Sequence, residues 1–432
     1  MNARYKAVDL FLATGLVVAG AQTAVRAEVV SGSAWQGING AEATLVSQGS
    51  SCRAVAVDGG GEGGSAEGGE GGEGGEGGEG GEGGEGGEGA AESLGAVTLA
   101  PEQQFRDRAI LTDFVDAVVV PNYELLAQRS GELSDAIAAF VETPTDDTLA
   151  AARQAWLATR QPWEQSEAFA FGPAASLGLD AELDDWPLNE TDVQAVLESG
   201  NALTPEHVAG LQTSQKGFHA IAFLLFGSDA DKSLAAFSDR DLEYLAAIGP
   251  VFDQTAQALL SSWTEGLDGF PAYRTEFVAA GEDSGAYLTV QAAGEEIVQG
   301  ILGLLDELGN VKIGEALATQ NPFLLEARFA QSSLQDFENN LLSAQNAYLG
   351  EFPAGNTQGK GLQAFVASVD PALDAQIMAQ LETAQKAVAA IPGPIEVTLC
   401  DPSARPHIET AQGSILALYE TFEEQVLPLV QQ

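Results

Sequence analysis

Two carboxylates, an arginine and two tryptophans share one helical face in the segment 156–173. At 3.6 residues per turn, one stripe carries Trp156, Arg160, Trp163, Glu164 and Glu167. An arginine keeps neighbouring carboxylates ionised when they are partly buried, and two carboxylates three residues apart can hold one hard or borderline cation. The pattern indicates either a cation site in a groove or a salt-bridged helix surface with the tryptophans beneath it.

A lone histidine lies in the most apolar helical stretch of the chain, 216–227. An imidazole in such surroundings must find a partner or remain neutral, so His219 is either a ligand or a satisfied core residue. The other histidines, His207 and His407, fall at predicted helix starts and are weaker candidates.

A third stretch, 321–350, is dense in polar side chains although its apolar residues recur with helical spacing. It contains Glu326, Arg328 and Asp336. Helix capping and hydrogen bonds between helices explain much of this polarity, and a contribution to a site is the alternative.

The charge balance narrows the partners of the protein. The 432 residues include 18 Lys and Arg against 63 Asp and Glu, a net charge of −45. The negative electrostatic field of such a chain repels phosphate backbones, so nucleic acid is not an expected partner. The acidic balance is compatible with binding of cations or with a surface that only keeps the protein soluble. Two cysteines, Cys52 and Cys400, are too few for a thiolate metal site or a disulfide framework. One bridge between them is possible.

Helical periodicity from residue 101 onward predicts an all-α fold. About eight long helices are too many for one four-helix bundle, so two packed bundle domains are expected, 101–268 and 269–432. Capping chemistry places starts at Thr145, at Thr204-Pro205, at Ser332 with Gln335, and at Asp370-Pro371. The predicted helices are 105–128, 145–169, 204–226, 239–263, 287–308, 332–348, 370–391 and 406–430.

The first hundred residues precede the folded part. Basic residues, an apolar run and a small-residue end predict a secretory signal over 1–27. Region 28–100 is expected to be disordered, because its Gly-Gly-Glu repeat at 59–89 has nothing to pack. No apolar stretch is long enough to span a membrane. The expected location is therefore outside the cytoplasm, periplasmic or associated with the cell surface.

Four segments in the same order resemble the imelysin-like family, in its iron-regulated protein A branch: 156–173, 184–188, 217–227 and 326–350. The resemblance covers the chain from about residue 103 onward. It implies an exported protein of two helical bundles, associated with bacterial iron acquisition, with its functional site in the groove between the bundles.

The chain departs from the family motif Gly-x-His-x-x-Glu at the last position. Gly217 and His219 match, but Ala222 stands where the family has glutamate. Any metal must then be held by His219 with carboxylates from another element, for which Glu164 and Glu167 are the first choices, or it is bound weakly or not at all. The supporting residues expected around it are Arg160, Trp163, Gly217, Arg328 and Asp336.

These observations favour a protein of iron acquisition or iron response that binds iron, another metal ion or a small metal chelate. Iron-uptake proteins are possible partners. One alternative is a zinc-dependent imelysin-type peptidase, which the missing carboxylate of Ala222 disfavours, because a hydrolase needs a firmly held ion and a base beside it. Another alternative is a non-catalytic module that docks a partner from a flexible Gly-Gly-Glu tether.

Overall fold

The computed structural model describes residues 44–45, 54–55, 99–100 and 103–432. The predicted signal, the Gly-Gly-Glu repeat and Cys52 lie outside these residues. The strands β1 (Thr44–Leu45) and β2 (Ala54–Val55) pair antiparallel. The rest of the described chain is all-α, as predicted, apart from two small hairpins. None of its described helices is long and apolar enough to cross a membrane.

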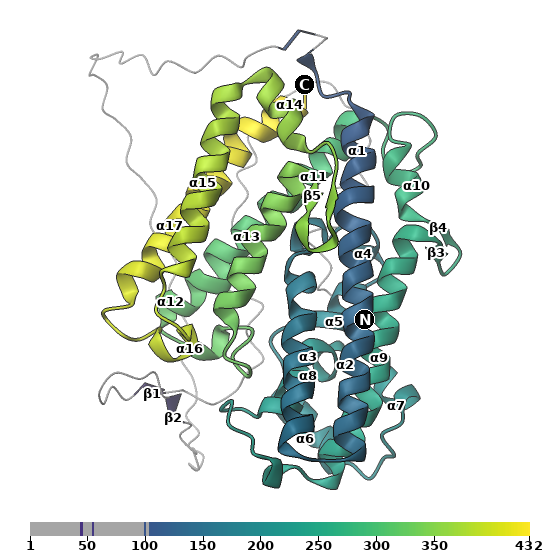
Figure 1. The fold of residues 1–432 in the computed structure, drawn as a ribbon, viewed down its shortest axis with the longest axis vertical. Helices are drawn as coiled ribbons and strands as arrows, with labels where there is room; N and C mark the ends of the chain where they lie inside the picture. The colour runs from purple at the N-terminus through teal and green to yellow at the C-terminus, as the bar shows by residue number, and fades with distance from the viewer. Residues whose placement is uncertain (1–43, 46–53, 56–98, 101–102) are drawn as a thin grey trace, which may run out of the picture.

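The first bundle is built on three long helices, α2, α3 and α9, in which α2 packs against both others (Figure 1). The starts of α1, α3 and α9 are capped, because Asp107, Thr145 and Ser238 accept hydrogen bonds from backbone N–H groups of the first turn. The helix α2 continues from α1 and η2 without a side-chain cap of its own. The elements of this half are α1 (Arg108–Phe114), η2 (Val115–Val119), α2 (Val120–Glu142), α3 (Asp146–Glu164), η3 (Glu167–Phe169), α4 (Pro173–Ser176), α5 (Leu179–Asp184), α6 (Glu190–Glu198), α7 (Pro205–Ala209), η4 (Thr213–Gln215), α8 (Gly217–Phe226), η5 (Leu234–Ala236) and α9 (Asp239–Thr264).

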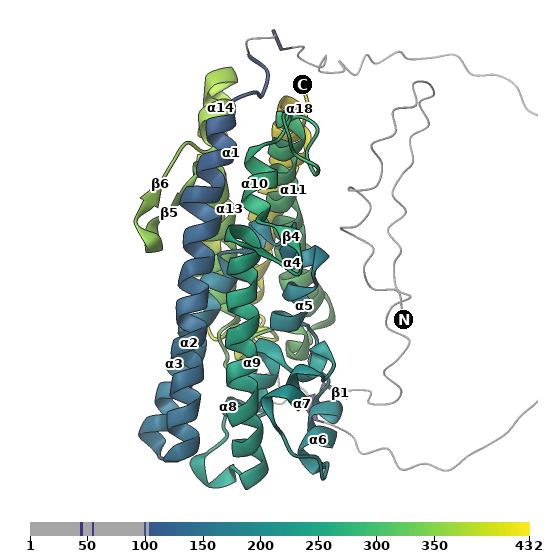
Figure 2. The same cartoon turned by 90° about the vertical axis from the view of Figure 1, so that its right-hand side faces the viewer.

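The second bundle contains α11, α13, α15 and α17, and α13 also packs on α3 of the first (Figures 1 and 2). The elements after α9 are β3 (Gly266–Leu267), β4 (Phe270–Pro271), α10 (Tyr273–Val278), α11 (Val290–Asp306), η6 (Glu307–Glu315), α12 (Ala316–Thr319), η7 (Pro322–Leu324), α13 (Ser333–Leu349), β5 (Glu351–Phe352), η8 (Pro353–Gly355), β6 (Thr357–Gln358), α14 (Leu362–Val369), α15 (Pro371–Ala389), α16 (Ile395–Thr398), α17 (Arg405–Thr421), η9 (Phe422–Val426) and α18 (Leu427–Val430).

Several sequence predictions of helix boundaries need correction. The helix expected over 105–128 begins at Arg108 and continues to Glu142, and the one expected over 145–169 ends at Glu164. The helix expected over 204–226 is divided into α7 and α8, with a 3-10 turn between them. Ser332 does not cap α13, because its hydroxyl has no hydrogen-bond partner among the described residues. The start at Asp370 is confirmed, since its side chain accepts from the N–H groups of Ala372 and Leu373. The placement of a domain boundary at residue 268 stays a prediction.

Candidate metal site

The end of α3 carries the first site residues. Trp156, Arg160, Trp163 and Glu164 are all at most 2% exposed, so the predicted stripe faces the interior. Pro162 lies in the last turn of α3, where it removes a backbone donor, and the helix stops at Glu164. The 3-10 turn η3 then presents Glu167.

Two glycines allow the backbone to approach closely beside the site. Gly217 has φ of 79°, and a Cβ there would lie 2.4 Å from the carbonyl oxygen of Leu183. A Cβ at Gly300 in α11 would lie 2.1 Å from the carbonyl oxygen of Ala168. Gly217 thus allows α8 to sit against the end of α5, which carries Asp184, and Gly300 allows α11 to sit against η3.

Asp184 joins three side chains from two other helices. Its Oδ1 accepts from Arg160 Nη1 at 2.5 Å, and its Oδ2 accepts from Trp163 Nε1 at 2.6 Å. His219 Nε2 lies 3.0 Å from Asp184 Oδ1. This contact does not have hydrogen-bond geometry, and neither ring nitrogen of His219 has a hydrogen-bond partner among the described residues. A buried imidazole therefore lies within ion-pair distance of a carboxylate through Nε2, and its Nδ1 has no hydrogen-bond partner among the described residues.

The second bundle supplies the opposite side of the site. Lys312 in η6 is 3% exposed, and its Nζ lies 3.0 Å from Glu326, 3.4 Å from Glu164 and 3.6 Å from Glu167. Asn340 of α13 donates to Glu164 Oε2 at 2.7 Å. Asp336, also on α13, accepts from Arg160 Nη2 at 2.9 Å. The site is thus assembled from both halves of the chain.

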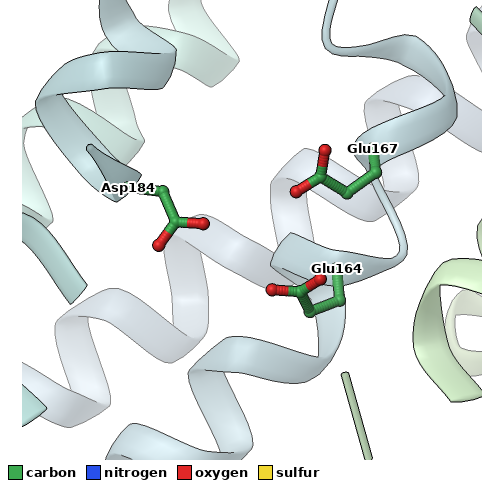
Figure 3. Close-up of side chains that lie close together, drawn as sticks. All are labelled: Glu164, Glu167 and Asp184. Atoms are coloured by element: carbon green, nitrogen blue, oxygen red, sulfur yellow. The ribbon is translucent and has the colours of Figure 1, made fainter. Parts of the chain in front are cut away.

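Three carboxylates point toward one another in this arrangement (Figure 3). Glu164, Glu167 and Asp184, the carboxylate triad, each offer an oxygen within 4.8 Å of the other two. With Glu326 and Asp336 they form the acid cluster, five carboxylates in contact with the two permanent cations Arg160 and Lys312. Full ionisation leaves three negative charges in excess. Oxygen-rich, acidic surroundings suit a hard cation.

The pKa values of these groups are shifted in opposite directions. Burial alone would raise the pKa of Asp184, but Arg160 and His219 hold it well below its usual range. Burial raises the pKa of Asp336 to about 6, against the opposing effect of Arg160. Burial raises the pKa of Glu167 as well, although Lys312 opposes the shift. Asp184 is therefore ionised at neutral pH, while its neighbours hold protons more readily than free carboxyls.

Comparison with known proteins decides the family. The family model described as Imelysin matches residues 119–422. The chain belongs to the imelysin family. It is 39% identical over 318 residues to Iron-regulated protein A of Synechococcus elongatus. The matched region covers 74% of this chain and 85% of that protein.

Two solved structures resemble this imelysin-family chain. One, from Parabacteroides distasonis, is described as an iron-regulated protein A precursor. It has a TM-score of 0.69 at 25% identity, and the match covers 78% of this chain and 97% of that chain. The other, an imelysin-like protein from Psychrobacter arcticum, has a TM-score of 0.60 at 16% identity, covering 78% and 98%, and shows a shared fold.

The structure brings most of the predicted site residues together. Glu164, Glu167 and Asp336 belong to the acid cluster, and Arg160 and Trp163 donate hydrogen bonds to it. Asp184, a member of the same cluster, lies 3.0 Å from His219 Nε2. Arg328 instead bonds to Glu190 and lies 4.0 Å from the ring centroid of Phe329. Asp184 and Lys312 were not predicted as site residues, although Asp184 begins one of the segments that resemble the family.

Acid titration gives a testable consequence for stability. Burial raises the pKa of Asp336 to about 6 and that of Glu307 to about 7. A carboxyl whose pKa is higher in the folded state stabilises it while protonated, and this contribution is lost as pH rises through the folded pKa. We therefore expect the metal-free unfolding free energy to fall by about 2–4 kcal/mol between pH 5 and pH 8. Urea unfolding at several pH values measures it. The Glu307→Gln variant is expected to flatten the profile, and a stability that rises over this range would contradict the prediction.

Proposed function

We propose that this protein binds a metal cation at the carboxylate triad and serves in an iron-related process outside the cytoplasm. The observation that carries the proposal is the triad itself, three carboxylate oxygens within 4.8 Å of one another in a cluster with more acids than bases. The second support is His219, 1% exposed, with its ring nitrogens not hydrogen-bonded within the described chain and one of them 3.0 Å from the triad residue Asp184.

The chemistry of the donor set favours a hard or borderline ion. Carboxylate oxygens suit ferric and ferrous iron, and an imidazole nitrogen adds a ligand that ferrous iron and zinc accept. Glu164, Glu167 and Asp184 would hold the ion, with His219 as a further donor. Asn340 and Trp163 would orient the carboxylates through the hydrogen bonds described above. The name of the relative from Synechococcus elongatus makes iron the first choice.

Calorimetric titration of the purified protein with ferrous, ferric and zinc ions tests this proposal. We expect one site per chain, at least about tenfold weaker in Glu167→Ala and in His219→Ala, because each variant removes one donor. His407→Ala, which removes an exposed histidine, is the matched control and is expected to bind like the parent. Equal weak binding by all four proteins would refute the proposal.

Restoring the family glutamate gives a gain-of-function prediction. Ala222 lies one helical turn from His219 on α8 and is 1% exposed. A glutamate there would add an oxygen beside the imidazole, so Ala222→Glu is expected to tighten metal binding by about tenfold or more. Ala222→Gln, similar in size but neutral, is the control for packing, and thermal unfolding checks that both variants fold. Affinity no better than that of the parent would show that position 222 does not face the bound ion.

A further inference from the structure

Lys312 makes an unusual set of contacts for a lysine. Its side chain is almost fully buried, and its three ion-pair partners within the described part of the chain are glutamates. Two of these partners, Glu164 and Glu167, are members of the carboxylate triad. The third, Glu326, lies outside the triad and is the nearest, at 3.0 Å.

The backbone that carries Lys312 is also irregular. It lies in η6, a nine-residue π-helical segment between α11 and α12. Such segments are rare and frequently mark functional sites. Gln412 of α17 donates to the carbonyl oxygen of Gly309 at 3.0 Å and so holds this segment from the outside. The lysine is thus presented from the second bundle, whereas all three triad carboxylates belong to the first.

We propose that Lys312 is a resident counter-cation of the carboxylate triad, which an incoming metal ion must displace from Glu164 and Glu167. This inference rests on the proposed function and adds its regulation. A metal ion bonded at about 2.0–2.3 Å to the oxygens that Lys312 contacts would lie within roughly 6 Å of the ammonium group, where like charges repel in a buried site. The two cations therefore exclude one another. Loading the site with metal therefore releases the ionic contacts of Lys312 with Glu164 and Glu167, which join the two bundles.

Zinc affinity of charge-changing variants tests the exclusion. Lys312→Met is expected to bind zinc at least about 30-fold more tightly than the parent, and Lys312→Arg is expected to gain nothing. The double variant Lys312→Met/Glu326→Gln removes one positive and one negative charge, so the net charge of the cluster is unchanged. This double variant keeps the test decisive if the single variant does not fold. It is also expected to bind zinc more tightly than the parent, because Glu164 and Glu167 no longer pair with a lysine. Lys386→Met is the control, since Lys386 is 71% exposed and pairs with Glu382.

A spectroscopic readout follows the displacement in the parent protein. The chain has only six lysines, so selective ¹⁵N labelling of lysine side chains gives a simple spectrum. Buried, ion-paired ammonium protons exchange slowly, and we expect the Lys312 signal, assigned with the Met variant, to shift or disappear when zinc is added.

The outcomes separate the two proposals. Tighter zinc binding by Lys312→Met and by Lys312→Met/Glu326→Gln supports displacement of Lys312 by the metal ion. If both variants that replace Lys312 by Met bind zinc no more tightly than the parent, while Glu167→Ala loses binding, the proposed role of Lys312 is overturned. The proposal of a metal site then stands. Absence of binding in the parent and in every variant overturns both.

Discussion

Asp184→Asn is expected to abolish measurable metal binding, with a loss of at least about 100-fold in affinity. Changes in groups that only orient a metal ligand cost about 10–100-fold, and this substitution removes a ligand as well as its orienting bonds. Both oxygens of Asp184 accept hydrogen bonds, from Arg160 Nη1 and from Trp163 Nε1. An asparagine replaces one of these acceptors by an amide donor, which must then face another donor.

The same substitution is expected to destabilise the metal-free protein by about 2–4 kcal/mol, because it breaks one arm of a buried ionic network. Urea unfolding and zinc or ferrous titration measure the two effects. Asp116→Asn is the matched control, because Asp116 also accepts two bonds from an arginine, Arg274, but in an exposed pair. An Asp184→Asn variant that keeps full affinity would exclude Asp184 from the site.

The sequence predicts the site residues that lie on one helix, but it does not predict the contacts between segments far apart in the chain. Helical spacing alone places Arg160 and Glu164 on one face of α3, and the cap at Thr145 sets where that helix begins. The predicted all-α fold is likewise confirmed. These features depend on residues within a few turns of one another, which is the range over which periodicity and capping act.

The contacts between distant segments depend on features that α-helical periodicity does not carry. Asp184 lies beside His219 because Gly217, with its positive φ, lets α8 close against the end of α5, and the sequence suggests instead one helix running through that glycine. Lys312 sits in a π-helical segment, where the number of residues per turn exceeds 3.6. Extrapolating an α-helical face from α11 therefore misplaces its side chain.

Arg160 is expected to be the residue whose loss costs the most stability. Arg160 is 1% exposed, its guanidinium pairs with Glu164, Asp184 and Asp336, and its Cζ lies 4.9 Å from the ring centroid of Phe218. Arg160→Met leaves three carboxylates without their shared partner, and we expect a loss of about 3–5 kcal/mol. Arg160→Lys is expected to recover little of it, because a single ammonium group cannot reproduce the planar guanidinium fork.

The pH dependence of this loss identifies its cause. Burial raises the pKa of Asp336 to about 6, and removing Arg160, which opposes that shift, raises it further. Asp336 is then protonated at pH 5, so the cost of Arg160→Met is expected to be smaller at pH 5 than at pH 8. Added zinc is expected to restore part of the stability at pH 8, since the vacated carboxylates gain a counter-ion. Urea unfolding of the variant and the parent at both pH values, with and without zinc, measures these differences.

Arg274→Met, which removes the arginine of the exposed pair with Asp116, is the control and is expected to cost at most about 1 kcal/mol at either pH. A cost for Arg160→Met that is equal at pH 5 and pH 8 would point to lost packing against Phe218, not to the unpaired carboxylates.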